Sequence, residues 1–148
     1  HDALPIFFET AVRNLRERGI EVIVHTILGL PGESQEDILA TMKYLNHRDI
    51  QGIKLQLLHV LKDTDLAQEY LEGKFHVYER EEYLNLVIRC LENLDPEIVI
   101  HRMTGDGPEK LLLAPLWTGR KREVLNLLHH QMKVCDSWQG KQFHSLPE

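Results

Sequence analysis

Residues 20–33 have the sequence IEVIVHTILGLPGE, and this stretch decides the fold class of the chain. Its first eight residues form a nearly continuous β-branched and apolar run, which predicts a strand buried on both faces. Gly29 and Gly32 then supply a tight turn, and Ser34 with Asp37 forms an acidic variant of the helix capping box. A strand, a glycine turn and a helix in this order predict one βα unit of an α/β fold.

The rest of the chain continues this alternation. The spacing of apolar residues predicts, in order, helix 3–18, strand 20–27, helix 34–46, strand 52–60, helix 65–72, helix 79–94, strand 98–103 and helix 120–135. This order is typical of parallel strands joined by helical crossovers. Three strands are too few to close a barrel, which takes about eight strands and roughly 250 residues. We therefore expect part of a larger α/β fold, with open sheet edges and a loose polar tail from residue 136.

Composition and charge exclude several classes of protein. With 43% hydrophobic and 27% charged residues, the chain has the balance of a soluble globular protein. No window approaches the roughly 18 apolar residues of a membrane span, and the start lacks a signal peptide, so we expect a cytoplasmic protein without a membrane partner. The net charge of -6 disfavours general nucleic-acid binding. The basic residues 120–122 are either a solvated helix face or a phosphate site.

The sequence offers no metal site. Its two cysteines, Cys90 and Cys135, stand about 45 residues apart on the apolar sides of two predicted helices. Structural metal sites pair their ligands a few residues apart, so both cysteines are expected to be reduced and buried in the core. The nine histidines show no HExxH spacing.

Ligands of parallel α/β folds bind at the carboxyl ends of strands, so the loops that follow strands are the candidate sites. The first loop, residues 29–33, has two glycines that let a ligand approach the backbone, although a tight turn alone also needs glycine. The second loop, residues 59–65, places His59 and Lys62 near a strand end, where Lys62 could pair with an acidic ligand group.

Other polar side chains lie in or after the strands. Lys54 and Gln56 share one strand face, which suits a polar barrel interior better than a core. In the third loop, Arg102 and Asp106 form an ion pair that shapes the loop, or else Arg102 faces a substrate. His25 is either a satisfied core histidine or part of a pocket beside the first loop. Spacing alone names no reaction.

Five motifs together resemble those of radical S-adenosylmethionine (radical-SAM) proteins. They are LGLPGE at residues 28–33, IKLQLLHVLK at 53–62, VIHR at 99–102, APLW at 114–117 and WQG at 138–140. The combination resembles one bacterial subfamily, usually described as uncharacterised and related to the Elongator-type and oxygen-independent coproporphyrinogen-oxidase branches. The resemblance covers residues 1–140.

The resemblance implies a partial (β/α)6 barrel in a longer parent protein. In that superfamily a CxxxCxxC loop after the first strand holds a [4Fe-4S] cluster, which reductively cleaves S-adenosylmethionine to methionine and a 5′-deoxyadenosyl radical. This sequence has neither that loop nor the glycine-rich motif after the second strand. We therefore expect residues 1–96 to be the last βα units of the barrel, residues 97–140 a C-terminal α/β extension and residues 141–148 a flexible tail. The chain alone should be inactive, with cluster and S-adenosylmethionine bound only in the parent.

The resemblance also implies which residues line the site. From the fifth-strand motif and the sixth-strand end, those expected to border S-adenosylmethionine are Ile27, Gly29, Glu33, His59, Val60 and Leu61. The strand and loop positions, without the resemblance, make six further residues possible substrate contacts, namely His25, Lys54, Gln56, Lys62, Arg102 and Asp106.

The expected partners are the N-terminal half of the same polypeptide and an unknown substrate. Open strand edges and apolar surface predict that the fragment self-associates. The Elongator-type relatives suggest tRNA as the substrate and a tRNA-modifying parent, by association at the level of fold alone. A further alternative is a non-catalytic α/β domain that binds a nucleotide or phosphate at the first loop.

Overall fold

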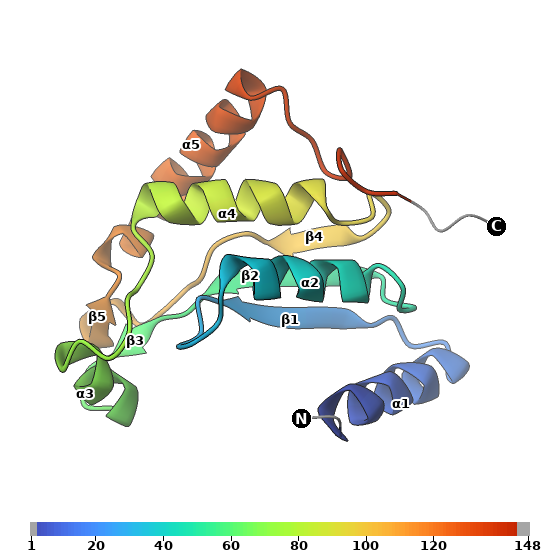
Figure 1. Cartoon of the computed structure of the whole chain (residues 1–148), viewed down its shortest axis with the longest axis horizontal. Coiled ribbons are helices and arrows are strands. Elements are labelled where there is room, and N and C mark those ends of the chain that lie inside the picture. The colour runs from blue at the N-terminus through green and yellow to red at the C-terminus, as the bar shows by residue number, and fades with distance from the viewer. Residues whose placement is uncertain (1–2, 145–148) are drawn as a thin grey trace.

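A computed structural model of the chain describes residues 3–144, which form an α/β fold (Figure 1). Its elements are α1 (Ala3–Glu17), β1 (Ile23–Leu28), α2 (Gln35–Leu45), β2 (Gly52–Leu57), β3 (Val60–Leu61), α3 (Asp65–Leu71), α4 (Arg80–Glu92), β4 (Val99–Arg102), η1 (Glu109–Leu111), β5 (Leu112–Ala114), η2 (Leu116–Gly119) and α5 (Lys121–Val134), where η marks a 3-10 turn. The predicted order of helices and long strands is confirmed. The sequence pattern missed β3, η1, β5 and η2 because each is too short to show a period. No helix in this part of the chain is long and apolar enough to cross a membrane.

The three longer strands form a parallel sheet in the order β1-β2-β4. β1 pairs with β2 from Ile23 opposite Gly52 to Leu28 opposite Leu57. β4 joins the other edge of β2 with Val99 opposite Gly52, and a register shift follows within β2. The prediction of a parallel α/β arrangement is confirmed, and residues 3–144 show no closed barrel.

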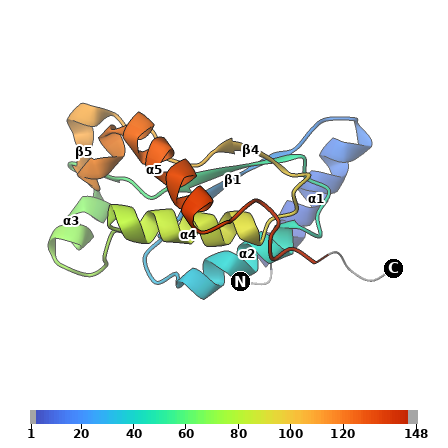
Figure 2. The same ribbon diagram turned by 90° about the horizontal axis from the view of Figure 1, so that it is seen from above.

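Helices α2 and α4 cover one face of this sheet (Figures 1 and 2). Leu55 on β2, Met42 on α2 and Leu86 on α4 are 0% exposed in the core between sheet and helices. Fully burying such a side chain stabilises the fold by about 1.5–3 kcal/mol. The predicted capping box starts α2, where the Asp37 N–H donates to Ser34 Oγ at 3.1 Å and the Ser34 N–H donates to Asp37 Oδ2 at 3.0 Å.

The opposite face of the sheet is uncovered by the described helices (Figure 2). Ile23, Ile27 and Val99 expose 43%, 45% and 56% of their surface. The prediction that the first strand is buried on both faces is therefore wrong for residues 3–144. A continuous apolar run is what a strand covered on both faces requires, and the described residues cover one face only.

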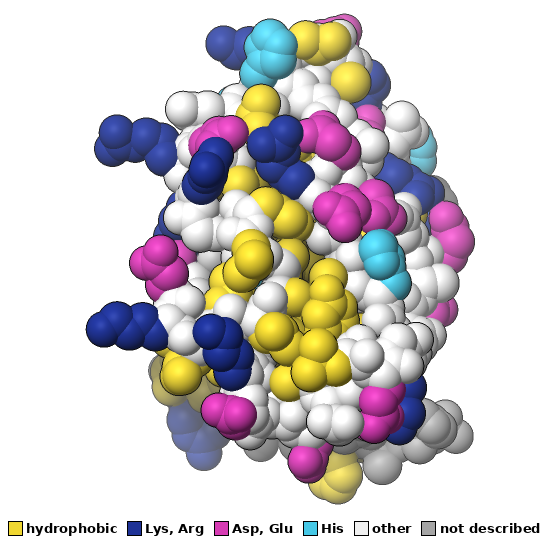
Figure 3. Space-filling view, turned by 90° about the vertical axis from the view of Figure 1, so that its left-hand side faces the viewer, with side chains coloured by type: hydrophobic (Ala, Val, Ile, Leu, Met, Phe, Trp, Pro, Cys, Tyr) yellow, Lys and Arg dark blue, Asp and Glu magenta, His cyan; other side chains and the backbone are white. Residues whose placement is uncertain are grey.

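A small second sheet lies at the carboxyl ends of the parallel strands. The predicted strand 52–60 ends early because the chain leaves the parallel sheet after Leu57, and β3 then pairs antiparallel with β5. Val60 and Ala114 pack with Ala67 of α3 in a core of their own. Hydrophobic side chains gather on the surface of this end of the molecule (Figure 3). The apolar pattern continues through residues 52–60, so it did not indicate that the chain leaves β1 and β4 after Leu57 and pairs with β5 from Val60.

The segment after α5 returns to the end of α4. The Gly140 N–H donates to the Leu91 carbonyl at 3.0 Å. The Gln139 amide donates to the carbonyls of Asp95 at 2.9 Å and Ile98 at 2.7 Å. The prediction of a loose tail from residue 136 is therefore wrong for residues 139 and 140. Its attachment uses hydrogen bonds to backbone carbonyls, which a polar composition does not reveal.

The two cysteines have different surroundings. Cys90 on α4 is 0% exposed, and burial raises the pKa of its thiol to about 12. Cys135 directly follows the last turn of α5 and is exposed, so its predicted place in the core is wrong. The apolar stripe of α5 ends before this residue, which the spacing alone did not mark.

Candidate functional site

Three loops lie at the carboxyl ends of the parallel strands, where α/β folds bind ligands. They are residues 29–33 after β1, residues 58–59 after β2 and residues 103–107 after β4. All three strands point toward the end of the molecule that carries β3 and β5 (Figure 1). Most predicted site residues fall on these loops or on the sheet face beside them.

Gly29 begins the first loop in a conformation that favours glycine. Its φ is +91°, and Gly32 in the same turn has a φ of +80°. A Cβ atom at Gly29 would lie 2.9 Å from Cε2 and 3.1 Å from Cδ2 of Tyr78. The position excludes a side chain for both reasons, and the Tyr78 ring lies directly against the backbone of the turn.

Glu33 closes this turn with a polar atom that lacks a protein partner. Its Oε1 is buried and makes no hydrogen bond to the described residues. Burial, and then the negative charge of Asp37, raises the pKa of the Glu33 carboxyl above its usual value. Because an unsatisfied buried acceptor costs free energy, a ligand that donates a hydrogen bond is favoured here.

Replacing Glu33 with glutamine should flatten the pH dependence of stability in weakly acidic solution. A raised pKa means that the folded state binds the proton more tightly than the unfolded state does. The stabilising contribution is therefore fully present below the unfolded pKa of about 4.3 and is lost as pH rises through the folded pKa. Urea denaturation of wild type and Glu33→Gln from about pH 4 to about pH 7 measures this slope. Glu21→Gln, at an exposed position, is the control, and an unchanged slope in Glu33→Gln would contradict the assignment.

The uncovered sheet face carries the polar residues predicted within the strands. His25 on β1 donates from Nε2 to Gln56 Oε1 on β2 at 2.7 Å. Lys54 lies opposite His25 in the register and is half-buried. Leu55, between Lys54 and Gln56, points into the core on the other face, which confirms the predicted alternation. His25 is exposed, so the alternative of a core histidine is wrong.

His59 follows β2 and is enclosed by the third loop. Its ring lies against Gly105, where a Cβ atom would collide with Cε1, and against Gly107, where a Cβ atom would lie 3.3 Å from Nδ1. Burial lowers the pKa of the His59 imidazole, and the negative charge of Asp106 opposes this in part. Burial thus favours the neutral form of the ring, whose buried Nε2 has no hydrogen-bond partner among residues 3–144.

The third loop is held by ion pairs to Asp106. Arg102 Nη2 lies 3.6 Å from Asp106 Oδ2, and Lys121 Nζ at the start of α5 lies 3.1 Å from the same oxygen. The predicted ion pair between Arg102 and Asp106 is thus confirmed. Since all three side chains are partly exposed, each pair contributes at most about 1 kcal/mol.

Three predicted site residues belong to the small sheet instead. Val60 is 0% exposed in the core of that sheet, so neither its side chain nor its backbone has accessible surface. Leu61 beside it is half-buried. Lys62 is exposed, and its Nζ donates to the Lys110 carbonyl at 3.5 Å, so it braces the small sheet rather than joining Lys54 on the parallel one.

Tyr78, Tyr83 and Trp117 are site residues that the sequence patterns did not single out. Tyr78 contacts the first loop at Gly29, and the Tyr83 hydroxyl donates to the Met103 carbonyl of the third loop at 2.6 Å. Trp117 contacts both tyrosines. A hydrophobic pattern does not distinguish these aromatic residues from others that only fill the core, so the APLW motif alone pointed to one of the three.

The described residues do not fit an iron–sulfur cluster. Within residues 3–144, no three side chains of His, Cys, Asp or Glu are grouped so that they could hold a metal ion. Cys90 is buried on α4, whereas Cys135 is exposed beyond α5. Such clusters are held by several grouped thiolates, which this part of the chain does not supply.

Known proteins resemble this chain over most of its length. The family described as Radical_SAM C-terminal domain matches residues 50–134. The uncharacterised protein YtqA of Bacillus subtilis is 41% identical over 137 residues, which are 93% of this chain and 42% of YtqA. The uncharacterised protein MJ0486 of Methanocaldococcus jannaschii is 33% identical over 144 residues, which are 97% of this chain and 44% of that protein. The chain therefore spans less than half the length of either relative.

A solved structure has the same arrangement of helices and strands. An Elp3 of the archaeon Methanocaldococcus infernus with an N-terminal deletion matches with a TM-score of 0.70 and 19% sequence identity. The match covers 87% of this chain and 31% of that one. At this identity the similarity concerns the fold alone. Because the match covers only 31% of the Elp3 chain, the matched region is one part of a larger structure in that protein.

Proposed function

Because the chain belongs to the Radical_SAM C-terminal domain family, we propose that it forms part of the S-adenosylmethionine site of a longer radical-SAM enzyme. The [4Fe-4S] cluster would be held by a part of the polypeptide beyond this chain. The observation that carries the proposal is the segment from the end of β1 into the following turn, in which Ile27 is exposed, Gly29 has no room for a side chain and the buried Glu33 Oε1 has no partner among residues 3–144.

These three residues fit an adenosine group. Ile27 is 45% exposed on the uncovered sheet face, so its apolar surface is free to pack against a flat purine ring. Tyr78 fills the side of Gly29 where a Cβ atom would stand, so the purine would meet the other side of the turn, where backbone N–H and carbonyl groups could form hydrogen bonds with it. The Glu33 carboxyl is an acceptor for the amino group of adenine. The backbone beside His59 would border the ribose.

The same face would hold the substrate. When bound and reductively cleaved, S-adenosylmethionine supplies a 5′-deoxyadenosyl radical, which removes a hydrogen atom from the substrate. The pair of His25 and Gln56, with Lys54 beside it, offers hydrogen bonds and a positive charge to orient a polar group. Arg102 would face the substrate from the end of β4, with Asp106 fixing its position.

The N-terminal half of the polypeptide would cover the exposed parts of this chain. Ile23 and Val99 on the uncovered face, and Leu71 and Leu116 near the small sheet, expose 43%, 56%, 67% and 72% of their surface. Exposed apolar surface favours association, so the isolated chain would self-associate. It would be inactive because it lacks the cluster-binding loop. A cytoplasmic location and a tRNA substrate stay predictions.

The experiment that tests the proposal uses the full-length protein. It would be reconstituted with iron and sulfide without oxygen, reduced, and assayed for 5′-deoxyadenosine formed from S-adenosylmethionine. We expect formation of this nucleoside by the wild type, loss of it when the upstream cysteines are replaced, and none from the 148-residue chain alone.

Two outcomes would contradict the proposal. One is a parent protein without a CxxxCxxC motif. The other is a reduced, cluster-loaded protein that leaves S-adenosylmethionine intact. In either case the alternative of a non-catalytic nucleotide- or phosphate-binding domain is tested by titrating the chain alone with adenosine nucleotides and inorganic phosphate.

A further inference from the structure

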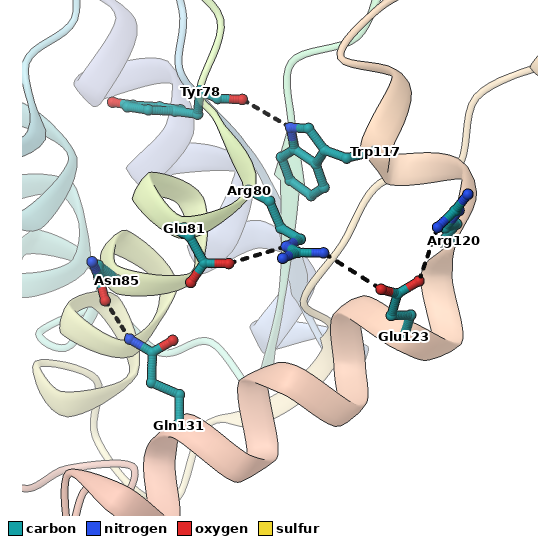
Figure 4. Close-up of polar contacts among 8 residues, drawn as sticks. All are labelled: Tyr78, Arg80, Glu81, Asn85, Trp117, Arg120, Glu123 and Gln131. Atoms are coloured by element: carbon teal, nitrogen blue, oxygen red, sulfur yellow. Dashed lines mark hydrogen bonds and ion pairs between the residues drawn. The ribbon is translucent and has the colours of Figure 1, made fainter.

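Three aromatic side chains connect the first and third loops. Trp117 on η2 contacts the other two, Tyr78 and Tyr83. Its Nε1–H donates to the carbonyl oxygen of Tyr78 at 3.0 Å (Figure 4). Its indole also packs against the ring of Tyr83, with ring centroids 5.5 Å apart and an angle of 40° between the planes. Tilted contacts of this kind are favourable aromatic pairs.

Tyr78 carries the connection to the first loop. Its ring lies so close to Gly29 that an added Cβ atom would be 2.9 Å away. The hydrogen bond from Trp117 uses the backbone carbonyl of Tyr78, whereas the contact with Gly29 uses its side chain. The position of the turn beside the adenosine site therefore depends on where Trp117 holds residue 78.

Tyr83 carries the connection to the third loop. It is 1% exposed, and its hydroxyl donates to the Met103 carbonyl at 2.6 Å. Met103 directly precedes residues 104–107, whose glycines enclose the ring of His59. A shift of Tyr83 would therefore displace the loop that sets the position of His59.

The segment that carries Trp117 is itself anchored to α4. Arg80 Nη1 at the start of α4 lies 3.4 Å from Glu123 Oε1 on α5, and the Gln131 amide donates to the Asn85 side chain further along (Figure 4). Val124 of α5 is 1% exposed in the main core. These contacts fix α5, which follows η2 after one residue, on the same helix that carries Tyr83.

We infer that Trp117 is a positioning residue that sets the separation between the Gly29 turn and the loop around His59, and so between S-adenosylmethionine and substrate. The inference rests on the proposed function for what each loop binds. The connection between the loops through Trp117 stands on the contacts alone.

Three substitutions in the full-length protein separate the two arms of this connection. Trp117→Phe removes the N–H donor to Tyr78 and, because phenyl is smaller than indole, also reduces the packing against Tyr83. Tyr78→Leu removes the ring against Gly29 and keeps the carbonyl acceptor, whereas Tyr83→Phe removes only the hydroxyl that bonds Met103. Trp138→Phe is the control, because Trp138 is 53% exposed and is the other tryptophan of the chain.

Amide hydrogen exchange of the ligand-free protein is the first measurement. We expect Trp117→Phe to speed exchange about three- to tenfold in residues 29–33 and in residues 103–107. This factor corresponds to the free energy of about one hydrogen bond. Tyr78→Leu should affect only the first segment, Tyr83→Phe only the second, and Trp138→Phe neither. An equal increase along the whole chain in Trp117→Phe, or no change in either loop, overturns the inference.

Equilibrium binding of S-adenosylhomocysteine is the second measurement. Trp117→Phe should bind this analogue about three- to tenfold more weakly than wild type, with Trp138→Phe unchanged. Equal affinity in wild type and Trp117→Phe overturns the role in positioning the cofactor. If the wild type itself fails to bind, the proposed function fails, and the exchange pattern still decides whether Trp117 connects the loops.

Discussion

Alanine at position 29 should lower the free energy of unfolding by about 2–5 kcal/mol, as the sum of two separate costs. The first is backbone strain, because a φ of +91° is unfavourable for any residue with a Cβ atom. The second is overlap with the Tyr78 ring, which a Cβ atom would approach to 2.9 Å. Urea denaturation of wild type and Gly29→Ala measures the sum.

Gly32→Ala separates the two costs. Its φ of +80° is strained in the same way, but nothing lies within 4 Å of the position that its Cβ atom would take. Gly32→Ala should therefore cost about 1–2 kcal/mol, and the remainder in Gly29→Ala belongs to the Tyr78 contact. Equal losses in the two variants would mean that the Tyr78 ring moves aside without cost. In the full-length protein, Gly29→Ala should also weaken S-adenosylmethionine binding, since the ring and the ligand meet the same turn.

Leu55→Ala should lower the free energy of unfolding by about 2–5 kcal/mol. Leu55 sits in the central strand and is 0% exposed between the sheet and its helices. Its truncation leaves a cavity that the neighbouring helices fill only in part. Chemical denaturation of the chain gives the magnitude.

Lys54→Ala is the matched control on the same strand. The Lys54 side chain is half-buried on the uncovered face, so its removal should change stability by less than about 1 kcal/mol. A large loss in Lys54→Ala, or a small one in Leu55→Ala, would contradict the assignment of the covered and uncovered faces.

Local signals in the sequence predicted the elements of the fold well. The capping box at Ser34 and Asp37 marks the start of α2, and the alternation of Lys54, Leu55 and Gln56 marks the two faces of β2. Such signals depend on residues close together in the chain. The pairing of β3 with β5 joins segments about 50 residues apart, and no local pattern specifies which distant strand a short segment meets.

The candidate site was predictable only in part for the same reason. Strand-end loops follow from the topology, so Gly29, Glu33 and His59 could be chosen in advance. The exposure of His25 and the lack of a partner for Glu33 Oε1 depend on which segments pack nearby. The spacing of residues along the chain carries no information about that packing. The role of Trp117 depends on a contact with a backbone carbonyl 39 residues away.

The two cysteines of the chain differ in their accessibility to thiol reagents, so one of them can be labelled selectively. Alkylating reagents attack the thiolate of an accessible cysteine, and Cys90 offers neither access nor a thiolate near neutral pH. Cys135 is exposed at the end of α5, on the helix that follows the Trp117 segment. A maleimide-linked fluorophore or spin label would therefore attach to this 148-residue chain at Cys135 and report on movements of that helix, with no cysteine introduced or removed.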